Sequence, residues 1–242
     1  MGQLSTNYLE IARRASLSRR AFNKVFGIGA HKTGTTTLAA VFQLCGLQVG
    51  EQDRGELTSY NARRGRYEAL AAYVNTAEAF QDSPFAEGQV YVALDALFPN
   101  SRFILTVRDS AEWYRSLHAF TAKRYGLPPD GPIPRESLEG DNYLFPTYSL
   151  EAHASMYLTA APDYTTTPAG PAAVMWDKLY HRDHYIAAYE RRNAAVREYF
   201  KHRPDQLLEI DLTKETTIDR IAAFLGLPDA FREVPLPHEN RT

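Results

Sequence analysis

Short apolar runs alternate along the chain with longer segments whose apolar residues recur at helical spacing. The short runs are typical of buried strands, and the longer segments are typical of helices that pack one face on a sheet. The predicted strands are 24–29, 101–107 and 207–212, and the helices that follow them are 36–44, 111–120 and 217–225. Because strands that alternate with helices imply crossover connections, the pattern predicts an α/β fold with a mainly parallel central sheet flanked by helices.

The regular pattern fails between about 121 and 171, where eight of the fourteen prolines lie. Proline removes a backbone donor and interrupts both helices and sheets. We therefore expect an insertion or lid, rich in Pro and Tyr, over about 121–182, followed by a long amphipathic helix over 183–200. Because there is no internal repeat and no long linker, the sequence predicts one domain over residues 1–242.

Charge and composition narrow the class of protein. The 27 Lys and Arg residues nearly balance the 29 Asp and Glu residues, which gives a formal net charge of −2. This balance does not suggest a nucleic-acid partner, so an anion site would be local. No apolar stretch reaches the ~18 residues of a transmembrane helix. The single cysteine, Cys45, is expected in the core and suits a reducing compartment, so we expect a cytoplasmic protein without a transmembrane segment.

The segment 29–37, with the sequence GAHKTGTTT, joins a predicted strand to a predicted helix. Its glycines allow a tight bend, and inward N–H groups together with the helix N-terminus favour a doubly anionic group. The loop differs from a Walker A loop because Lys32 lies two residues before Gly34, whereas a Walker loop has its lysine directly after the glycine. The alternative interpretation is an ordinary Gly/Thr turn that opens a helix.

A second possible anion site follows the strand predicted at 101–107. Arg108 stands at the end of this strand, and Ser116 lies about two helical turns further on. Ligands of open α/β sheets bind beyond the carboxyl ends of the strands, where Arg108 is expected. The alternative is that Arg108 is a structural partner of Asp109 or Glu112.

Together these motifs resemble those of the sulfotransferase family. The order of lysine, hydroxyl, glycine and threonines in the first loop is similar to the family's 5′-phosphosulfate loop, and 103–117 is similar to its 3′-phosphate motif. The similarity covers about 25–118 and 183–241. It implies a P-loop kinase-like, three-layer fold and the transfer of a sulfuryl group from 3′-phosphoadenosine 5′-phosphosulfate (PAPS) to an acceptor.

The resemblance also implies a role for each motif residue. Lys32 would neutralise the bridging and leaving oxygens, and Arg108 with Ser116 would bind the 3′-phosphate. The cofactor's 5′ end would be held by Lys32 and by Thr33, Gly34, Thr35, Thr36 and Thr37. Related enzymes end in a basic loop that is missing here, and Arg241 is the candidate to replace it. A sulfuryl group in transfer carries less negative charge than a phosphoryl group, so we expect no metal ion.

An acceptor hydroxyl or amine must lose a proton, so a base is expected within hydrogen-bond reach of it. The sulfotransferases that the chain resembles place a histidine or a carboxylate between the two motifs, and this resemblance implies that Asp82, in the corresponding region, is the general base. The structural alternative is a helix cap or turn former, because Asp82 precedes Ser-Pro. Three histidines are alternative bases: His31, His153 and His184.

The acceptor is not identified by the sequence. The tyrosines of the insertion are expected either to line an apolar or sugar-stacking pocket or to pack a loop-rich subdomain. We expect a hydroxyl or amine of a small-molecule, sugar or lipid-linked acceptor. The alternative functions are a P-loop ATP-dependent kinase, with Asp95 or Asp109 as the acid for Mg²⁺, and a non-catalytic nucleotide-binding protein. No feature predicts an oligomeric state.

Overall fold

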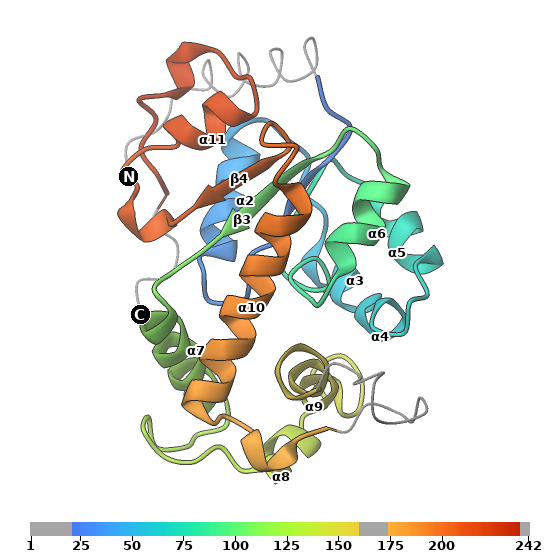
Figure 1. The fold of residues 1–242 in the computed structure, drawn as a ribbon, viewed down its shortest axis with the longest axis vertical. Helices are drawn as coiled ribbons and strands as arrows, with labels where there is room; N and C mark the ends of the chain where they lie inside the picture. Colours follow the sequence, from blue (N-terminus) through green and yellow to red (C-terminus); the bar gives the residue numbers. More distant parts are fainter. Residues whose placement is uncertain (1–20, 160–173, 238–242) are drawn as a thin grey trace. The chain divides into compact units, whose positions relative to one another are not determined.

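The computed structural model of the protein describes residues 21–159 and 174–237 and divides into two compact units (Figure 1). The sheet unit runs up to Arg108 and resumes at Val196, and the helical unit spans Asp109–Ala195. The insertion expected over 121–182 falls inside the helical unit. One domain over residues 1–242 stays a prediction.

The sheet unit is built on four parallel strands in the order β2-β1-β3-β4. These strands are β1 (Val25–Gly27), β2 (Ala79–Phe80), β3 (Arg102–Thr106) and β4 (Leu207–Ile210). Val25 is in register with both Ala79 and Arg102, and Phe103 is in register with Leu207. The parallel sheet with its helices confirms the predicted α/β class. Because β1 has β2 on one side and β3 on the other, the topological switch point lies between β1 and β3, where ligands of such sheets bind.

The helices of the sheet unit are mostly short. They are α2 (Thr35–Leu44), α3 (Gln52–Glu56), α4 (Ser59–Ala62), α5 (Glu68–Val74), α6 (Val90–Leu97), α11 (Asp219–Phe224) and the last turn of α10 (Arg182–Phe200). Helices α3 to α6 and strand β2 were not predicted, since elements of two to eight residues carry too little periodicity to stand out. Helix α11 was expected at 217–225 and is shorter at both ends.

Apolar side chains cover the two faces of the sheet in two separate clusters. Because side chains alternate along a strand, Val25 joins the cluster that contains α2 and α11, whereas Phe26 joins the cluster that contains α6 and the end of α10. The second cluster is rich in phenylalanine, and the rings of Phe103 and Phe200 lie 4.8 Å apart. Cys45 is fully buried in the first cluster, where burial raises the pKa of its thiol to about 12. It is a core residue, as expected.

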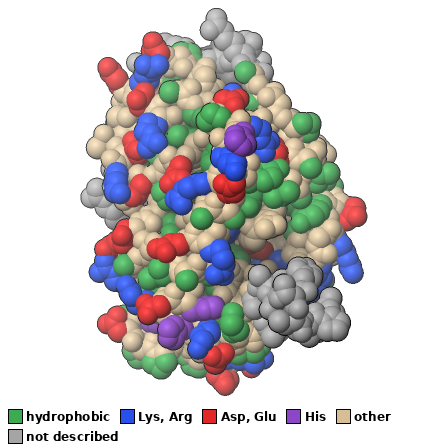
Figure 2. All heavy atoms as spheres, viewed as in Figure 1, with side chains coloured by type: hydrophobic (Ala, Val, Ile, Leu, Met, Phe, Trp, Pro, Cys, Tyr) green, Lys and Arg blue, Asp and Glu red, His purple; other side chains and the backbone are tan. Residues whose placement is uncertain are grey.

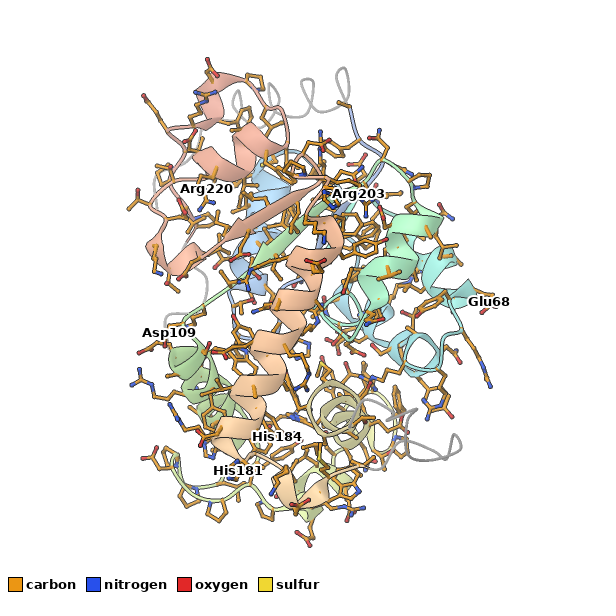
Figure 3. All side chains as sticks on the ribbon, viewed as in Figure 1. Glu68, Asp109, His181, His184, Arg203 and Arg220 are labelled. Atoms are coloured by element: carbon orange, nitrogen blue, oxygen red, sulfur yellow. The ribbon has the colours of Figure 1, made fainter. Side chains whose placement is uncertain are left out.

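The helical unit contains α7 (Ser110–Arg124) and most of α10. Helix α7 begins at Asp109, whose carboxylate accepts hydrogen bonds from the N–H groups of Ala111 and Glu112, and Figure 3 labels Asp109 at this helix start. The other elements are α8 (Arg135–Glu139), α9 (Tyr148–His153), a π-helical turn (Ala154–Leu158) and a 3₁₀ turn (Trp176–Lys178). In the described part of the insertion the only extended pairing is an isolated bridge between Thr159 and Val174.

Aromatic rings form the core of the helical unit. Trp113 of α7 stacks on Tyr189 of α10 with the ring centroids 4.3 Å apart. Tyr157 stacks on Tyr185 at 4.6 Å, and Tyr180 stacks on Tyr185 at 5.1 Å. All five rings are buried. Of the two expectations for the insertion's tyrosines, packing of a subdomain therefore describes Tyr157 and Tyr180.

Across the described ranges, no helix combines the length and the apolar character needed to cross a membrane.

Candidate active site

The loop between β1 and α2 is fixed by close packing against the end of β3. The N–H of Ile28 donates to the carbonyl of Ile104 at 2.8 Å, which continues the strand pairing into the loop. A Cβ at Gly29 would overlap both the side chain and the main chain of Thr106. Lys32 and Gly34 have φ angles of 66° and 95°, so the chain turns twice through the left-handed region before α2 begins. This compact loop lies at the switch point of the sheet.

The hydroxyl of Thr33 holds the loop together. It donates to the carbonyl of Ala30 at 2.6 Å and lies 2.6 Å from the hydroxyl oxygen of Thr106. Thr33 is buried, so its hydroxyl is committed to the loop and only its backbone N–H is suited to an incoming anion. The sequence did not distinguish this threonine from its neighbours.

Helix α2 presents an N-terminus suited to an anion. It begins after Gly34 with no side-chain cap and no acidic residue in its first turn. The first N–H groups of any helix have no partner within the helix. Thr36 is exposed and Thr37 is partly exposed at this end, whereas Thr35 is buried. The loop therefore offers backbone donors and two accessible hydroxyls next to Lys32.

Asp82 and Arg108 both lie close enough to Lys32 to affect its pKa. Partial burial lowers the pKa of Lys32, the carboxylate of Asp82 opposes this effect, and the guanidinium of Arg108 lowers the pKa further. Arg108 follows β3, whose pairing with β4 extends through the bond from the Val107 N–H to the carbonyl of Ile210. The structure thus brings together three predicted site residues that are up to 76 positions apart.

Asp82 accepts three hydrogen bonds. Oδ1 lies 2.8 Å from Nε2 of His31 and accepts from the N–H of Ser83 at 2.9 Å, and Oδ2 accepts from the hydroxyl of Thr35 at 2.7 Å. Burial alone would raise the pKa of Asp82, but His31 and these donors outweigh burial and lower it to about 2. Asp82 also opens a turn, since its carbonyl accepts from the N–H of Ala86. Its side chain is about one-quarter exposed, so it reaches solvent while serving this turn.

His31 forms an ion pair with Asp82. Burial acts to lower the pKa of His31, but Asp82, with smaller effects from Glu87 and Glu56, outweighs burial and raises it above its ordinary value. Nε2 of His31 also lies 2.8 Å from the hydroxyl oxygen of Ser83. The sequence proposed Asp82 and His31 as separate candidates for the base, and the structure joins them in one pair.

A buried ion pair anchors the segment that follows Asp82. Arg63 donates to both carboxylate oxygens of Glu87, through Nε at 2.7 Å and through Nη2 at 3.0 Å. The two side chains are only 4% and 2% exposed. This pair is not apparent in the sequence, because nothing in the pattern around either residue distinguishes it from an exposed charge.

The remaining predicted residues are placed as follows. Ser116 is partly exposed on α7 in the helical unit, so its joint action with Arg108 stays a prediction. Arg241 lies outside the described residues. Nε2 of His184, which Figure 3 labels, bonds to the carbonyl of Tyr157 at 2.8 Å. His153 bonds to two tyrosines, so both histidines are engaged within the helical unit.

The acids considered for Mg²⁺ have other partners. Asp95 lies on helix α6 rather than after a strand, and it accepts hydrogen bonds from Tyr199 and Arg203, both at 2.7 Å. Asp109 caps α7, and Glu112, one of the proposed structural partners of Arg108, pairs with Arg115.

On the face seen in Figure 2, basic and acidic side chains are interspersed, as a near-neutral chain leads one to expect.

A parallel α/β fold with a cationic loop and an uncapped helix N-terminus at its switch point belongs to the class of folds that bind anionic ligands at this edge of the sheet. The sulfotransferase domain family matches residues 24–242, and the chain therefore belongs to that family. Sulfuryl transfer is the activity of this family, which makes the protein a transferase. No curated protein matches the chain.

Proposed function

We propose that the protein is a PAPS-dependent sulfotransferase that acts on a hydroxyl or amine of an acceptor. The observation that carries this proposal is that Lys32 lies in the loop that leads into the uncapped N-terminus of α2, within electrostatic reach of both Asp82 and Arg108. This set fits the donor, since it offers a cation and backbone N–H groups where a sulfate ester linked to phosphate needs them.

Each side of the site has its own task. Lys32 and the backbone N–H groups of residues 33–37 bind the 5′ end of the donor and stabilise the negative charge that develops on its leaving oxygen. Thr36 and Thr37 add hydroxyl donors, whereas Thr33 and Thr35 act through their main chain because their hydroxyls are engaged. The 3′-phosphate is assigned to Arg108, with Ser116 and Arg241 as further ligands.

Asp82 orients the acceptor and receives its proton. A carboxylate accepts about four hydrogen bonds, and the described residues supply Asp82 with three, of which Oδ2 receives one. A second donor at Oδ2 would be the acceptor's O–H or N–H. As the new bond to sulfur forms and the bond from sulfur to the 5′-phosphate breaks, the acceptor atom becomes acidic. A carboxylate of low pKa can then take the proton late.

The finer features of the function belong to the same proposal. The donor is PAPS, the product is adenosine 3′,5′-bisphosphate, and the acceptor is a small-molecule, sugar or lipid-linked compound rather than a nucleic acid. We place the reaction in the cytoplasm because a single cysteine suits a reducing compartment. No metal ion takes part in this scheme, since Lys32 supplies the positive charge.

A thermal-shift titration tests the donor site. Adenosine 3′,5′-bisphosphate at a hundred times its Kd should add ~2.7 kcal/mol to the stability of the protein. Lys32→Ala and Arg108→Ala should abolish this shift. Their controls, Lys214→Ala and Arg66→Ala, remove exposed charges and should leave it intact. Stabilisation by ATP with Mg²⁺ alone would overturn the proposal in favour of a kinase. Bisphosphate binding without turnover of any acceptor would favour a non-catalytic nucleotide-binding protein.

A further inference from the structure

Two glutamine side chains extend the candidate site at the carboxyl end of β2. Gln81 follows this strand directly and packs over the end of β1, because a Cβ added at Gly27 would lie 3.0 Å from that of Gln81. Nε2 of Gln81 donates to Oε1 of Gln52 at 3.2 Å. Gln52 in turn belongs to α3, so the amide pair joins that helix to the residue next to Asp82.

The direction of the hydrogen bonds in this pair is fixed by two acceptors. Nε2 of Gln52 donates to Oε1 of Glu56 at 2.8 Å and to the carbonyl of Ser83 at 3.4 Å. A carboxylate and a carbonyl can only accept, so Gln52 must present its nitrogen to them and its oxygen to Gln81. Gln81 must then present its own nitrogen to Gln52. The oxygen of Gln81 is the end of this chain of donors.

The oxygen of Gln81 is buried and accepts no hydrogen bond from any residue in the described ranges. A buried carbonyl that lacks a donor is costly, and the cost is recovered when a ligand supplies one. Gln81 is the neighbour of Asp82 in the chain. Both Gln52 and His31 reach Ser83, Gln52 at its carbonyl and His31 at its hydroxyl. The amide pair and the His31–Asp82 pair therefore belong to one hydrogen-bond network that is connected through Ser83.

We propose that the acceptor carries a second hydrogen-bond donor next to the group that is sulfated, and that Oε1 of Gln81 receives it. The acceptor class is then a vicinal diol or amino alcohol, on a sugar or an aromatic ring, rather than a compound with one isolated hydroxyl. Gln81 is the residue that determines this specificity. The inference rests on the proposed function, because it places the reacting group at Asp82.

Four probes with the same aromatic ring test whether a second hydrogen-bond donor beside the hydroxyl group contributes to binding. Catechol and ortho-aminophenol carry a second donor beside the hydroxyl, guaiacol keeps the second oxygen but not its hydrogen, and phenol lacks both. We would measure their binding to the full chain by ligand-observed NMR, with and without adenosine 3′,5′-bisphosphate. Catechol and ortho-aminophenol should bind about tenfold more tightly than guaiacol and phenol, which is the value of one hydrogen bond to a buried acceptor.

Gln81→Met removes the acceptor atom at nearly constant volume, and its control is Gln43→Met on the exposed side of α2. The preference should fall to within about threefold in Gln81→Met and persist in the control. Equal binding of the four probes to the native protein, binding of none, or an unchanged preference in Gln81→Met would each overturn the inference. The bisphosphate shift is read on the same samples. Its absence in the native protein contradicts the proposed function, whereas a normal shift without a catechol preference contradicts only the role of Gln81.

Discussion

Each of the two units contains a histidine that is hydrogen-bonded within it, and the partners of the two histidines differ in charge. In the sheet unit, His31 pairs with the carboxylate of Asp82 at 2.8 Å. In the helical unit, His153 lies between two neutral hydroxyls, with Nε2 at 3.1 Å from that of Tyr180 and Nδ1 at 3.2 Å from that of Tyr185. One histidine belongs to an ion pair and the other to a chain of neutral hydrogen bonds.

The direction of the neutral chain follows from one hydroxyl. Thr121 donates to the carbonyl of Leu117 at 3.1 Å, so its oxygen must accept from Tyr180 at 2.6 Å. Tyr180 then accepts from Nε2 of His153, and Nδ1 accepts from Tyr185. Burial raises the pKa of both tyrosines, so they stay protonated. Every proton in this chain is committed to a partner.

The two histidines differ in whether a proton can move to or from their partners. The His31–Asp82 pair has charge, partial exposure and acceptor capacity at Oδ2, so a proton can enter or leave it. The chain through His153 joins α7, α9 and α10 through neutral hydroxyl groups, which is the arrangement of a packed core. Two histidines proposed as alternative bases are therefore suited to different tasks.

The largest expected effect is on turnover. Asp82→Asn keeps the shape and tolerates the left-handed φ of 65°, but it removes the proton acceptor. We expect kcat to fall by roughly 10²–10⁴-fold, the usual contribution of a general base, while the affinity for adenosine 3′,5′-bisphosphate changes little. Steady-state kinetics with a thermal-shift control measures both. Asp53→Asn, on the exposed side of α3, is the matched control, and an unchanged kcat in Asp82→Asn would remove Asp82 from this role.

The second effect is on stability. Glu87→Gln leaves the guanidinium of Arg63 buried without its carboxylate, and breaking a buried pair in this way costs roughly 3–5 kcal/mol. Chemical denaturation of the full chain measures the loss. Glu68→Gln, an exposed glutamate on α5 that is labelled in Figure 3, should change stability by little. A loss below about 1 kcal/mol for Glu87→Gln, the value of an exposed pair, would contradict the role of this anchor.

The third effect is a dependence on pH. The pKa of Asp82 is lowered from 3.8 to about 2, so its contribution to stability, about 2 kcal/mol, is present above pH ~4 and is lost as the pH falls toward 2. The pKa of His31 is raised from 6.5, so its contribution is present below pH 6.5 and is lost as the pH rises through the raised value. Denaturation at several pH values measures both.

Asp82→Asn serves as the control for this pH dependence. The variant should flatten the acid limb of the stability profile, and an NMR titration should show the pKa of His31 falling, because burial then acts with less opposition. An unchanged His31 titration in Asp82→Asn would show that the two groups are not a pair.

The smallest effect concerns the neutral chain. His153→Phe fills the same space but leaves the hydroxyls of Tyr180 and Tyr185 without their partner, at a cost of about 1 kcal/mol. The bisphosphate shift should stay unchanged. His184→Phe, which removes one bond to a carbonyl, is the comparison variant. If His153→Phe abolished turnover while the shift and the stability persisted, His153 would become the candidate base in place of His31 and Asp82.

The sequence predicted the parts of the fold that depend on local pattern. The strand before Gly29 and the helix after Gly34 stand out because an apolar run, a glycine loop and helical periodicity follow one another within about 20 residues. The capped start of α7 is equally local, since Asp109 lies beside the N–H groups that it accepts from. Strand β2 has two residues, too few for a period, and its partners become apparent only in the assembled sheet.

The sequence predicted residues of the candidate site but not the hydrogen bonds that join them. Lys32, Asp82 and Arg108 were each proposed from position and chemistry. The bond from Thr35 to Asp82 and the amide pair of Gln52 and Gln81 join segments about 30 to 50 positions apart, and no spacing rule relates such residues. Thr33 was predicted to bind the 5′ end of the donor, and the structure shows that its hydroxyl closes the loop itself, so only its backbone N–H is suited to that role.

The C-terminal segment of the sheet unit packs against the loop between β1 and α2. Strand β4 pairs with β3 from about a hundred positions further along the chain, and the side chain of Leu212, just beyond β4, packs 3.0 Å from where a Cβ of Gly34 would be. Contacts this distant in sequence are slow to form. During synthesis the loop between β1 and α2 is made early, but Leu212 follows only about 180 residues later. A nascent chain halted before β4 should therefore have all of the loop's residues and none of its anion affinity.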